Sequence, residues 1–503
     1  MRGWGAIGAL MLALMPASAM AEWTEAKSKH FTVYSDGTPK QLMDFADDLE
    51  RFDFLLRLMT GVSRDPAQDT GAPVRIWLLP NDGAVKAATG NPNIAGLYFP
   101  SNRGGVAIAS RERASNRFDL DGKVILFHEY THHFMLHYFP SGYPTWYVEG
   151  FAEYFSTATF AGAGQMDLGR PPLGRAVNLV LSGTFPLDQL TARATTGGMN
   201  LSQGDRFYGT AWLLTHFFEN RPERKKQFQA YLSDVAAGKA DVKFADYFGG
   251  SLDPLEKEMR TYLQRPLRYR RMELKAPLAT QIVVRSMSDD ENAVIKSEMQ
   301  YLLDKDENSA PPKYLPDLRA LAARFPNSAY VQSLLSDVER SSGNRAQAME
   351  AADRAVAADP NYARALSAKA ELLIEKAAAS GTDADWNAAR DMVVRANRAD
   401  TEDPVPLKQY FRYTAERGRG IPTVAYDGLW KAFGLVPQDP GIRFMLASAL
   451  ANKGDYDQAA RLMDPLANSP HDSSIRQSAI SMREALMQAK AKGEKMTLEL
   501  GEE

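Results

Sequence analysis

The sequence predicts an α+β domain followed by an all-α array of helical hairpins. Between residues 22 and 264, short apolar runs with strand character come first and amphipathic helical patterns come later, an order typical of an α+β domain. Between residues 313 and 490 the patterns are helical, and Pro326, Pro360, Pro404, Pro440 and Pro470 follow one another at spacings of 34, 44, 36 and 30 residues. Such recurrence indicates repeated supersecondary units.

The elements of the N-terminal domain follow from local pattern. Apolar residues at helical spacing after Pro39 predict the first helix, and short apolar runs between turn residues predict the strands. The expected elements are a strand at 30–35, a helix at 39–59, a strand at 74–79, a hairpin within 94–109, and helices at 206–218, 223–236 and 254–263. The stretch 104–110 is expected to be an edge strand that could pair with an extended peptide.

A histidine-rich helix is the most informative feature of the chain. Residues 128–132 read His-Glu-Tyr-Thr-His inside an apolar run. Residues four apart lie on one helix face, so His128 and His132 can direct both imidazoles at one metal ion, and Glu129 can reach a water bound to it. The pattern predicts the zinc site of a hydrolase. The alternative is a core helix that happens to carry two histidines.

A second helix can complete this site. The first helix should end at Pro140, and the second should begin near Thr145, with Thr145 as its N-cap. A short connection packs such helices together, so Glu149 can face the first helix and Glu153 lies on the same face. Glu153 could accept the free ring N–H of a ligating histidine. The segment around these two glutamates is rich in aromatic residues, and carboxylates in such surroundings need a positive partner. This disfavours the alternative that both glutamates lie on a solvated helix face.

Residues 128–132 and the Trp-x-x-Glu-Gly-x-Ala-x-Tyr-Phe segment at 146–155 together resemble the gluzincin metallopeptidases. The second segment is similar to aminopeptidase N and leukotriene hydrolase, and the match is closer to the peptidase MA-like families of bacterial exported proteins. The resemblance covers mainly residues 22–264 and implies a zincin-like catalytic fold. It also implies Zn²⁺ held by His128, His132 and Glu149, with Glu129 as the base that polarises the water.

The resemblance extends to a tyrosine and departs at two points. Tyr208 is placed like the tyrosine that faces the developing oxyanion in aminopeptidase-like gluzincins, although it could instead simply pack at a helix start. Only 16 residues separate His132 from Glu149, fewer than in the aminopeptidases. Their Gly-x-Met-Glu-Asn segment, which holds the substrate amine, has no counterpart here. The missing anchor favours an endopeptidase, or a peptidase of unknown preference.

Three other histidines are assigned different roles. His133 and His137 form a second pair at i and i+4, rotated by about 100° from the first pair. No acidic motif accompanies them, so they are expected at the surface or around the metal ligands rather than in a second metal site. His216 could donate a hydrogen bond at the site, but a satisfied core or surface histidine is the better interpretation.

The first residues and the composition bear on location. Arg2, the apolar run 7–15 and Ala19-Met20-Ala21 predict a signal peptide over residues 1–21, which favours a periplasmic or secreted protein. No later apolar run is long enough for a membrane span. The net charge of −3 and the absence of a basic stripe argue against nucleic-acid binding. The chain has no cysteine, so any metal ligands are nitrogen or oxygen atoms.

The rest of the chain divides into a connector, an array and a tail. Residues 265–312 form a charged connector with a predicted strand at 282–285 and a helix at 291–303. Residues 313–490 resemble tetratricopeptide repeats, most clearly at 334–360 and 446–470, and each of the five recurring prolines is expected to close a helical segment. A plain helical bundle is the alternative. Such repeats stack into a solenoid that can bind a protein partner, and a charged tail over 491–503 follows.

The leading functional hypothesis is an exported zinc metallopeptidase that acts on a protein or peptide substrate. An alternative of another class is a tetratricopeptide scaffold or adaptor whose zinc domain does not catalyse. The intact Glu129 argues against that alternative, since a structural zinc site has no use for this carboxylate. Zinc hydrolysis of a substrate other than a peptide is a third possibility.

Overall fold

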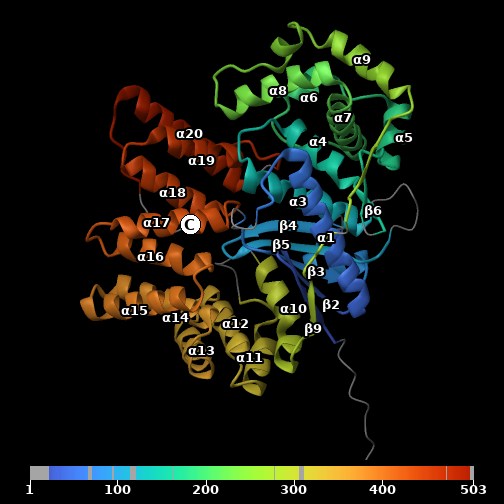
Figure 1. Cartoon of the computed structure of the whole chain (residues 1–503). Helices are drawn as coiled ribbons and strands as arrows, with labels where there is room; N and C mark the ends of the chain where they lie inside the picture. Colours follow the sequence, from blue (N-terminus) through green and yellow to red (C-terminus); the bar gives the residue numbers. More distant parts are fainter. Residues whose placement is uncertain are drawn as a thin grey trace, which may run out of the picture.

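An N-terminal α/β region is joined to a C-terminal stretch of consecutive helices (Figure 1). The computed structural model describes residues 22–498, except 66–68, 70, 93, 95, 114–120, 163, 277, 305–310 and 472. The predicted signal peptide and the end of the predicted tail lie outside the described residues. The expected division into a mixed α and β part and an all-helical part is confirmed.

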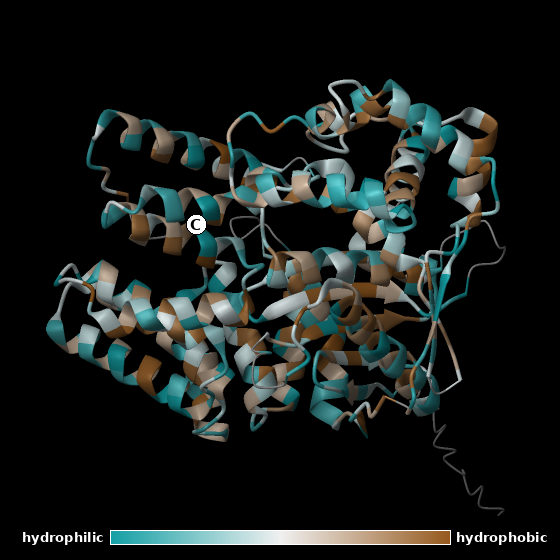
Figure 2. Cartoon of the chain, turned by 45° about the horizontal axis from the view of Figure 1, so that its top comes forward, coloured by the Kyte–Doolittle hydropathy of each residue, from teal (hydrophilic) through white to brown (hydrophobic). Residues whose placement is uncertain are grey.

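A six-stranded mixed sheet underlies the N-terminal region, in the order β4-β5-β3-β2-β1-β9. The pairs β2–β3 and β3–β5 are parallel, and the other pairs are antiparallel. Figure 2 shows brown, hydrophobic residues on the strands at the centre of the molecule. The strands are β1 (Thr24–Lys27), β2 (Phe31–Ser35), β3 (Val74–Leu79), β4 (Gly96–Ser101), β5 (Gly104–Ser110) and β9 (Val283–Ser286).

The edge of this sheet is formed by a different strand from the one predicted. β5 pairs with β3 on one side and with β4 on the other, and all seven of its residues are buried. The prediction that 104–110 is an edge strand is therefore wrong. A run that is apolar on both faces suits an interior strand, whereas β4 contains Pro100, whose missing N–H is tolerated at an edge.

Nine α-helices and a small antiparallel sheet complete the described part of this region. Helix α1 begins with a capping box between Thr38 and Gln41 and ends at Gly61, whose φ is 77°. The small sheet has the order β6-β7-β8. The helices are α1 (Pro39–Thr60), α2 (Asp82–Thr89), α3 (Gly122–Tyr138), α4 (Thr145–Ser156), α5 (Leu173–Ser182), α6 (Leu187–Ala192), α7 (Leu201–Glu219), α8 (Pro222–Ala236) and α9 (Asp253–Leu263), and the strands are β6 (Thr159–Ala161), β7 (Gln165–Leu168) and β8 (Arg270–Glu273).

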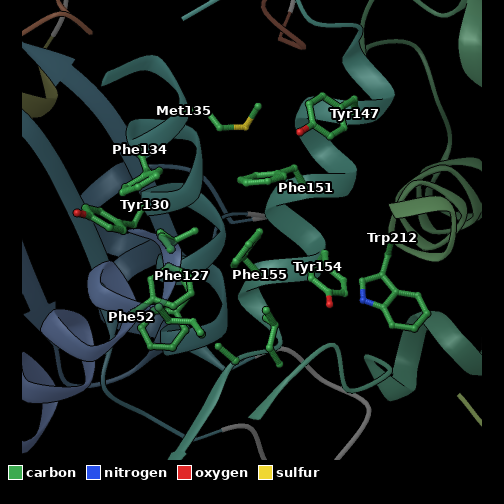
Figure 3. Close-up of a cluster of buried hydrophobic side chains, with 14 of the residues drawn as sticks. Phe52, Phe127, Tyr130, Phe134, Met135, Tyr147, Phe151, Tyr154, Phe155 and Trp212 are labelled. Atoms are coloured by element: carbon green, nitrogen blue, oxygen red, sulfur yellow. The ribbon is translucent and has the colours of Figure 1, made fainter. Parts of the chain in front are cut away.

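An aromatic core lies between α3 and the helices that pack on it. Figure 3 shows Phe127 and Phe134 of α3 facing Phe151 and Phe155 of α4. Phe52 of α1 stacks on Phe127 with ring centroids 4.0 Å apart and planes at 6°. Burial of each such ring removes a large apolar surface from water and stabilises the fold by roughly 1.5–3 kcal/mol. The two helices predicted to carry metal ligands thus share one rigid core.

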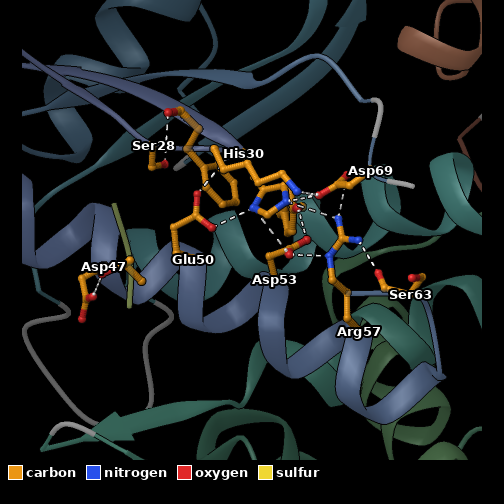
Figure 4. A network of polar contacts seen from close by, with 12 residues as sticks. Ser28, His30, Asp47, Glu50, Asp53, Arg57, Ser63 and Asp69 are labelled. Carbon is orange, nitrogen blue, oxygen red and sulfur yellow. Dashed lines mark hydrogen bonds and ion pairs between the residues drawn. The ribbon is translucent and has the colours of Figure 1, made fainter. Parts of the chain in front are cut away.

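A buried network of charges lies on the other side of α3, between β2 and α1 (Figure 4). The His30 ring lies between two carboxylates, with Nδ1 2.7 Å from Glu50 and Nε2 2.6 Å from Asp69. Arg57 donates to Asp53 over 2.6 Å and lies 3.1 Å from Asp69. Lys29, Tyr130 and Tyr138 also face this network.

The charge of His30 is set by these neighbours. Burial works to lower the pKa of His30, but hydrogen bonds to Asp69 and Glu50 and the charge of Asp53 outweigh it and raise the pKa to about 10. The protonated imidazole in turn holds the pKa of Asp69 and of Glu50 below the usual range, against the effect of burial. His30 is therefore a buried cation that joins β2, α1 and the loop that carries Asp69.

The predicted connector is built into the fold. β8 joins the small sheet, β9 joins the large sheet, and α10 (Asp289–Leu303) packs on the sheet through Ile295 and Met299. Glu298 of α10 is buried and lies 3.5 Å from Arg75 of β3. It also lies 2.6 Å from Arg364 of the helical array. One carboxylate thus connects the sheet, the connector and the array.

The helical array consists of paired helices, in agreement with a solenoid. The pairs α12/α13, α14/α15, α16/α17 and α18/α19 pack closely, and α20 packs on α19. They are α11 (Leu315–Arg324), α12 (Ala329–Ser341), α13 (Arg345–Ala358), α14 (Ala363–Ser380), α15 (Asp383–Ala399), α16 (Pro404–Glu416), α17 (Thr423–Leu435), α18 (Pro440–Asn452), α19 (Tyr456–Ala467) and α20 (Ser474–Lys492). Figure 1 shows the later pairs of this array, in orange and red, beside the N-terminal region.

Two of the recurring prolines do not close helices as predicted. Pro404 and Pro440 are the first residues of α16 and α18, after the N-caps Asp403 and Asp439. The first turn of a helix tolerates proline because a backbone N–H at that position would have no partner within the helix.

In the predicted tail, Leu498 exchanges two hydrogen bonds with Asn452 and so folds back on the array. None of the described helices has the length and apolar character of a membrane span.

Candidate metal centre

Helix α3 places His128 and His132 side by side. Asp121 caps the helix by accepting a hydrogen bond from the Val124 amide. A Cβ at Gly122 would collide with the backbone of β5, so glycine lets the helix begin against the sheet. The Nε2 atoms of His128 and His132 lie 3.1 Å apart, and their rings are nearly perpendicular. The helix ends at Tyr138, shortly before Pro140, as predicted.

Helix α4 brings Glu149 to both imidazoles. One carboxylate oxygen of Glu149 lies 3.2 Å from Nε2 of His128 and 3.6 Å from Nε2 of His132. The prediction that Thr145 caps this helix is wrong. The N-cap is Pro144, and the Thr145 hydroxyl instead donates to the Ala194 carbonyl over 2.6 Å. That bond ties the start of α4 to the segment before α7.

Glycine after Glu149 lets α4 approach α7 closely. A Cβ at Gly150 would lie 2.5 Å from the Ala211 carbonyl oxygen and 2.7 Å from the Thr215 hydroxyl. Real side chains do not make such contacts. Gly150 therefore lets α4 lie close to α7 and so sets the position of Glu149 relative to α3. This explains in physical terms why glycine stands at this position.

These three residues have the composition and spacing of a metal site. The ligand atoms of His128, His132 and Glu149 all lie within 4.8 Å of one another. Glu149 is fully buried, and among the described residues neither of its carboxylate oxygens accepts a well-formed hydrogen bond. A buried carboxylate without hydrogen bonds is costly unless a cation neutralises it. The group can therefore hold a metal ion, and two imidazoles with a carboxylate are a donor set that suits zinc.

The ionisable groups of this site shift one another's pKa values. Burial works to lower the pKa of His128, but the Glu149 carboxylate 3.2 Å from its Nε2 and the charges of Glu153 and Glu129 raise it to about 9. The pKa of Glu149 lies well below its usual range, because the two imidazoles outweigh the effect of burial. The raised pKa of His128 indicates that its surroundings stabilise positive charge, and the lowered pKa of Glu149 indicates that its carboxylate is ionised beside the imidazoles.

Glu153 lies behind His128, as predicted. Its carboxylate is 3.5 Å from Nδ1 of His128, the ring nitrogen on the side away from Glu149. Arg175 of α5 donates two hydrogen bonds to Glu153, over 2.7 and 2.8 Å. A bidentate arginine fixes the position of the carboxylate. Glu153 can then orient the imidazole of His128 toward an ion.

Arg175 was not predicted as part of the site. It is the one charged residue of α5 and lies in none of the motifs discussed above. Its guanidinium also lies over the Tyr208 ring, 4.7 Å from the centroid. The one indication in the sequence is that an arginine on a half-buried helix needs an anionic partner.

Tyr208 lies beside the metal ligands, on α7. Its ring centroid is 6.5 Å from that of His128. Burial and the charges of Glu149 and Glu153 raise its pKa above the usual value, while Thr196 and Arg175 oppose the rise. The phenol therefore keeps its proton over the accessible pH range and can act as a hydrogen-bond donor. Glu129, on α3 between the two histidines, is partly exposed.

His133 and His137 lie away from this centre. His133 is buried, with Nδ1 2.7 Å from the Tyr98 hydroxyl of β4, and burial lowers its pKa to about 3. His137 is partly buried near Gly71, and burial lowers its pKa to about 4. The expectation that these two lie at the surface or around the ligands is wrong, because that face of α3 packs on the sheet.

His216 is a satisfied core histidine, as predicted. It is fully buried on α7, and its two ring nitrogens face the Arg268 carbonyl at 2.8 Å and the Tyr262 hydroxyl at 2.8 Å. Both partners lie outside the candidate site, so His216 serves packing rather than chemistry.

No known family model and no curated protein matches this chain, so the assignment of its site depends on the geometry described above.

Proposed function

We propose that this chain is a zinc-dependent metallopeptidase that hydrolyses peptide bonds of proteins or peptides. The observation that supports this best is the buried Glu149 carboxylate, which lacks well-formed hydrogen bonds and faces the Nε2 atoms of His128 and His132. A bound zinc ion would polarise the scissile carbonyl and lower the pKa of a bound water toward 7.

The side chains of the chain would supply the remaining functions. Glu129 lies between the two ligands in sequence and is partly exposed, so it can take a proton from water and deliver it to the leaving amine. Tyr208 can donate a hydrogen bond to the oxygen on which negative charge develops. Glu153, fixed by Arg175, holds His128 in the orientation that its role requires.

The sheet offers a place for an extended substrate. β4 is the edge strand of the large sheet and packs beside α3. Its outer backbone groups can pair with a peptide strand. The same proposal includes the resemblance to gluzincins, the export of the chain and the binding of a protein partner by the array. The alternative, a scaffold whose zinc domain does not catalyse, is one outcome of the experiment.

The test uses the full chain and the variant Glu129→Gln. We expect the wild type to contain zinc and to cleave casein or a fluorogenic peptide library. The variant should keep its zinc, measured by mass spectrometry, and lose activity by a factor of at least about 10³. Glu223→Gln, an exposed position at the start of α8, is the matched control and should retain full activity. Cleavage retained in Glu129→Gln would refute the mechanism, and a tight partner bound without proteolysis would favour the scaffold.

A further inference from the structure

The loop after α19 reaches from the helical array to the candidate metal centre. Its Pro470 is buried, and the Pro470 carbonyl accepts hydrogen bonds from the backbone N–H of Thr196 at 2.8 Å and from the Thr196 hydroxyl at 3.1 Å. The next residue, His471, is exposed. Its ring centroid lies 6.4 Å from that of His132, with the two planes at 88°. A histidine of the array thus stands next to a metal ligand of α3.

Contacts with α3 and with the connection between α3 and α4 hold this part of the array. Arg443 of α18 is buried and donates a hydrogen bond to the Leu136 carbonyl, in the last turn of α3, over 3.3 Å. A positive charge at a helix C-terminus is favourable. The Asn468 amide packs against Gly142, between α3 and α4, where a Cβ would come within 2.8 Å of its nitrogen.

The anchor of the loop also leads to α4. Thr196, which binds Pro470, lies two residues after Ala194, whose carbonyl accepts the Thr145 hydroxyl at the start of α4. The position of His471 is therefore set by packing and hydrogen bonds on both sides of the metal centre. A loop held in this way can present a side chain with the precision that substrate contact requires.

The geometry of His471 fits substrate contact better than metal ligation. The group of atoms within 4.8 Å of one another consists of His128, His132 and Glu149, and His471 is not part of it. A neutral imidazole carries one N–H donor in either tautomer. Tyr208 lies beside His128 and His471 lies beside His132, so each ligand histidine has one polar side chain next to it that can reach a bound peptide.

We infer that His471 contacts the substrate, donating a hydrogen bond to a backbone carbonyl of a peptide bound at the metal centre. The helical array then supplies part of the catalytic site instead of serving only as a separate binding module. This inference rests on the proposed peptidase function. It requires no change in the protonation of His471, because the neutral ring is already a donor.

The test compares His471→Ala and His471→Gln with the wild type in the full chain. We expect both variants to bind one zinc per chain and to unfold at the wild-type temperature, since the side chain is exposed. His471→Ala should lower kcat/KM for a peptide by about 10- to 100-fold, the effect of removing one donor from a polar substrate group. His471→Gln, which keeps an N–H donor, should recover part of the loss.

A binding measurement separates this inference from the proposed function. Titration calorimetry with a peptide hydroxamate should show an affinity at least about tenfold weaker for His471→Ala than for the wild type. Wild-type affinity and turnover in His471→Ala, while Glu129→Gln is inactive, would overturn the inference and leave the peptidase proposal intact. Higher activity in His471→Ala would also overturn it, since the loop would then obstruct the site. If the wild type showed no cleavage that depends on Glu129, the peptidase proposal would be refuted. A weaker hydroxamate affinity in His471→Ala than in the wild type would in that case still support the contact between His471 and a bound peptide.

Discussion

Replacing Gly150 by alanine tests whether the approach of α4 to α7 sets the metal site. The added Cβ would lie 2.5 Å from the Ala211 carbonyl oxygen, and an ordinary contact needs about 3.4 Å, so one of the two backbones must move by close to 1 Å. Overpacking of this kind costs about 1–3 kcal/mol. The higher helix propensity of alanine returns about 1 kcal/mol of it. We expect a net destabilisation of up to about 2 kcal/mol.

The same displacement should weaken metal binding, because Glu149 is the adjacent residue. Ligand distances tolerate changes of only about 0.2 Å, so a shift of the backbone beside Glu149 should lower zinc affinity by about 10- to 100-fold, as other changes around metal ligands do. The assays are denaturant unfolding of the apo protein and competition for zinc against a chromophoric chelator. Both measurements are made on the full chain.

Gly204→Ala is the matched control for this substitution. Gly204 lies in α7, and a Cβ there would meet nothing within 4 Å. The control should stabilise the protein by roughly 0.5–1 kcal/mol and leave zinc affinity unchanged. If Gly150→Ala were as stable as Gly204→Ala and bound zinc like the wild type, the claim that Gly150 sets the position of Glu149 would be refuted.

Two further predictions concern the charged groups around α3. His30 has a folded-state pKa of about 10 against about 6.5 in an unfolded chain, so its contribution to stability is fully present below pH 6.5 and is lost as the pH rises through 10. His30→Gln should therefore show a flatter fall of unfolding free energy between pH 6.5 and 10 than the wild type, and parallel curves would contradict the charge assigned to His30. Arg175→Met should leave the Glu153 carboxylate buried without its partner, cost about 3 kcal/mol in denaturant unfolding and weaken zinc binding by about tenfold. Unchanged zinc affinity in that variant would show that Glu153 does not support His128.

Local patterns predicted most of the elements and the central residues of the site. The strand at 74–79 was predicted with the bounds of β3, because a continuous apolar run between turn residues has few other solutions. The pairing of His128 with His132 follows from helix geometry alone. Glu149 could be added because the connection between the two helices is short, which restricts how they pack.

The features that were missed depend on contacts between distant segments. Which of β4 and β5 forms the edge of the sheet is decided by pairing with β3, and an apolar run does not reveal the order of strands. Arg175 and His471 reach the site from α5 and from the loop after α19, and neither lies in a motif. Thr145 looks like an N-cap in sequence, but the N-cap is Pro144, and the Thr145 hydroxyl donates to the Ala194 carbonyl.

The contacts between the array and the N-terminal region bear on what the array does. Glu298 is buried between Arg75 of the sheet and Arg364 of α14, and removing one partner of such a group costs about 3–5 kcal/mol. Arg103, in the β4–β5 turn, pairs with Asp403 at the start of α16. A flexible tether would need none of these contacts. The array is therefore fixed to the sheet at one end and to α3 and the α3–α4 connection at the other, so the candidate metal centre has one fixed orientation relative to the array.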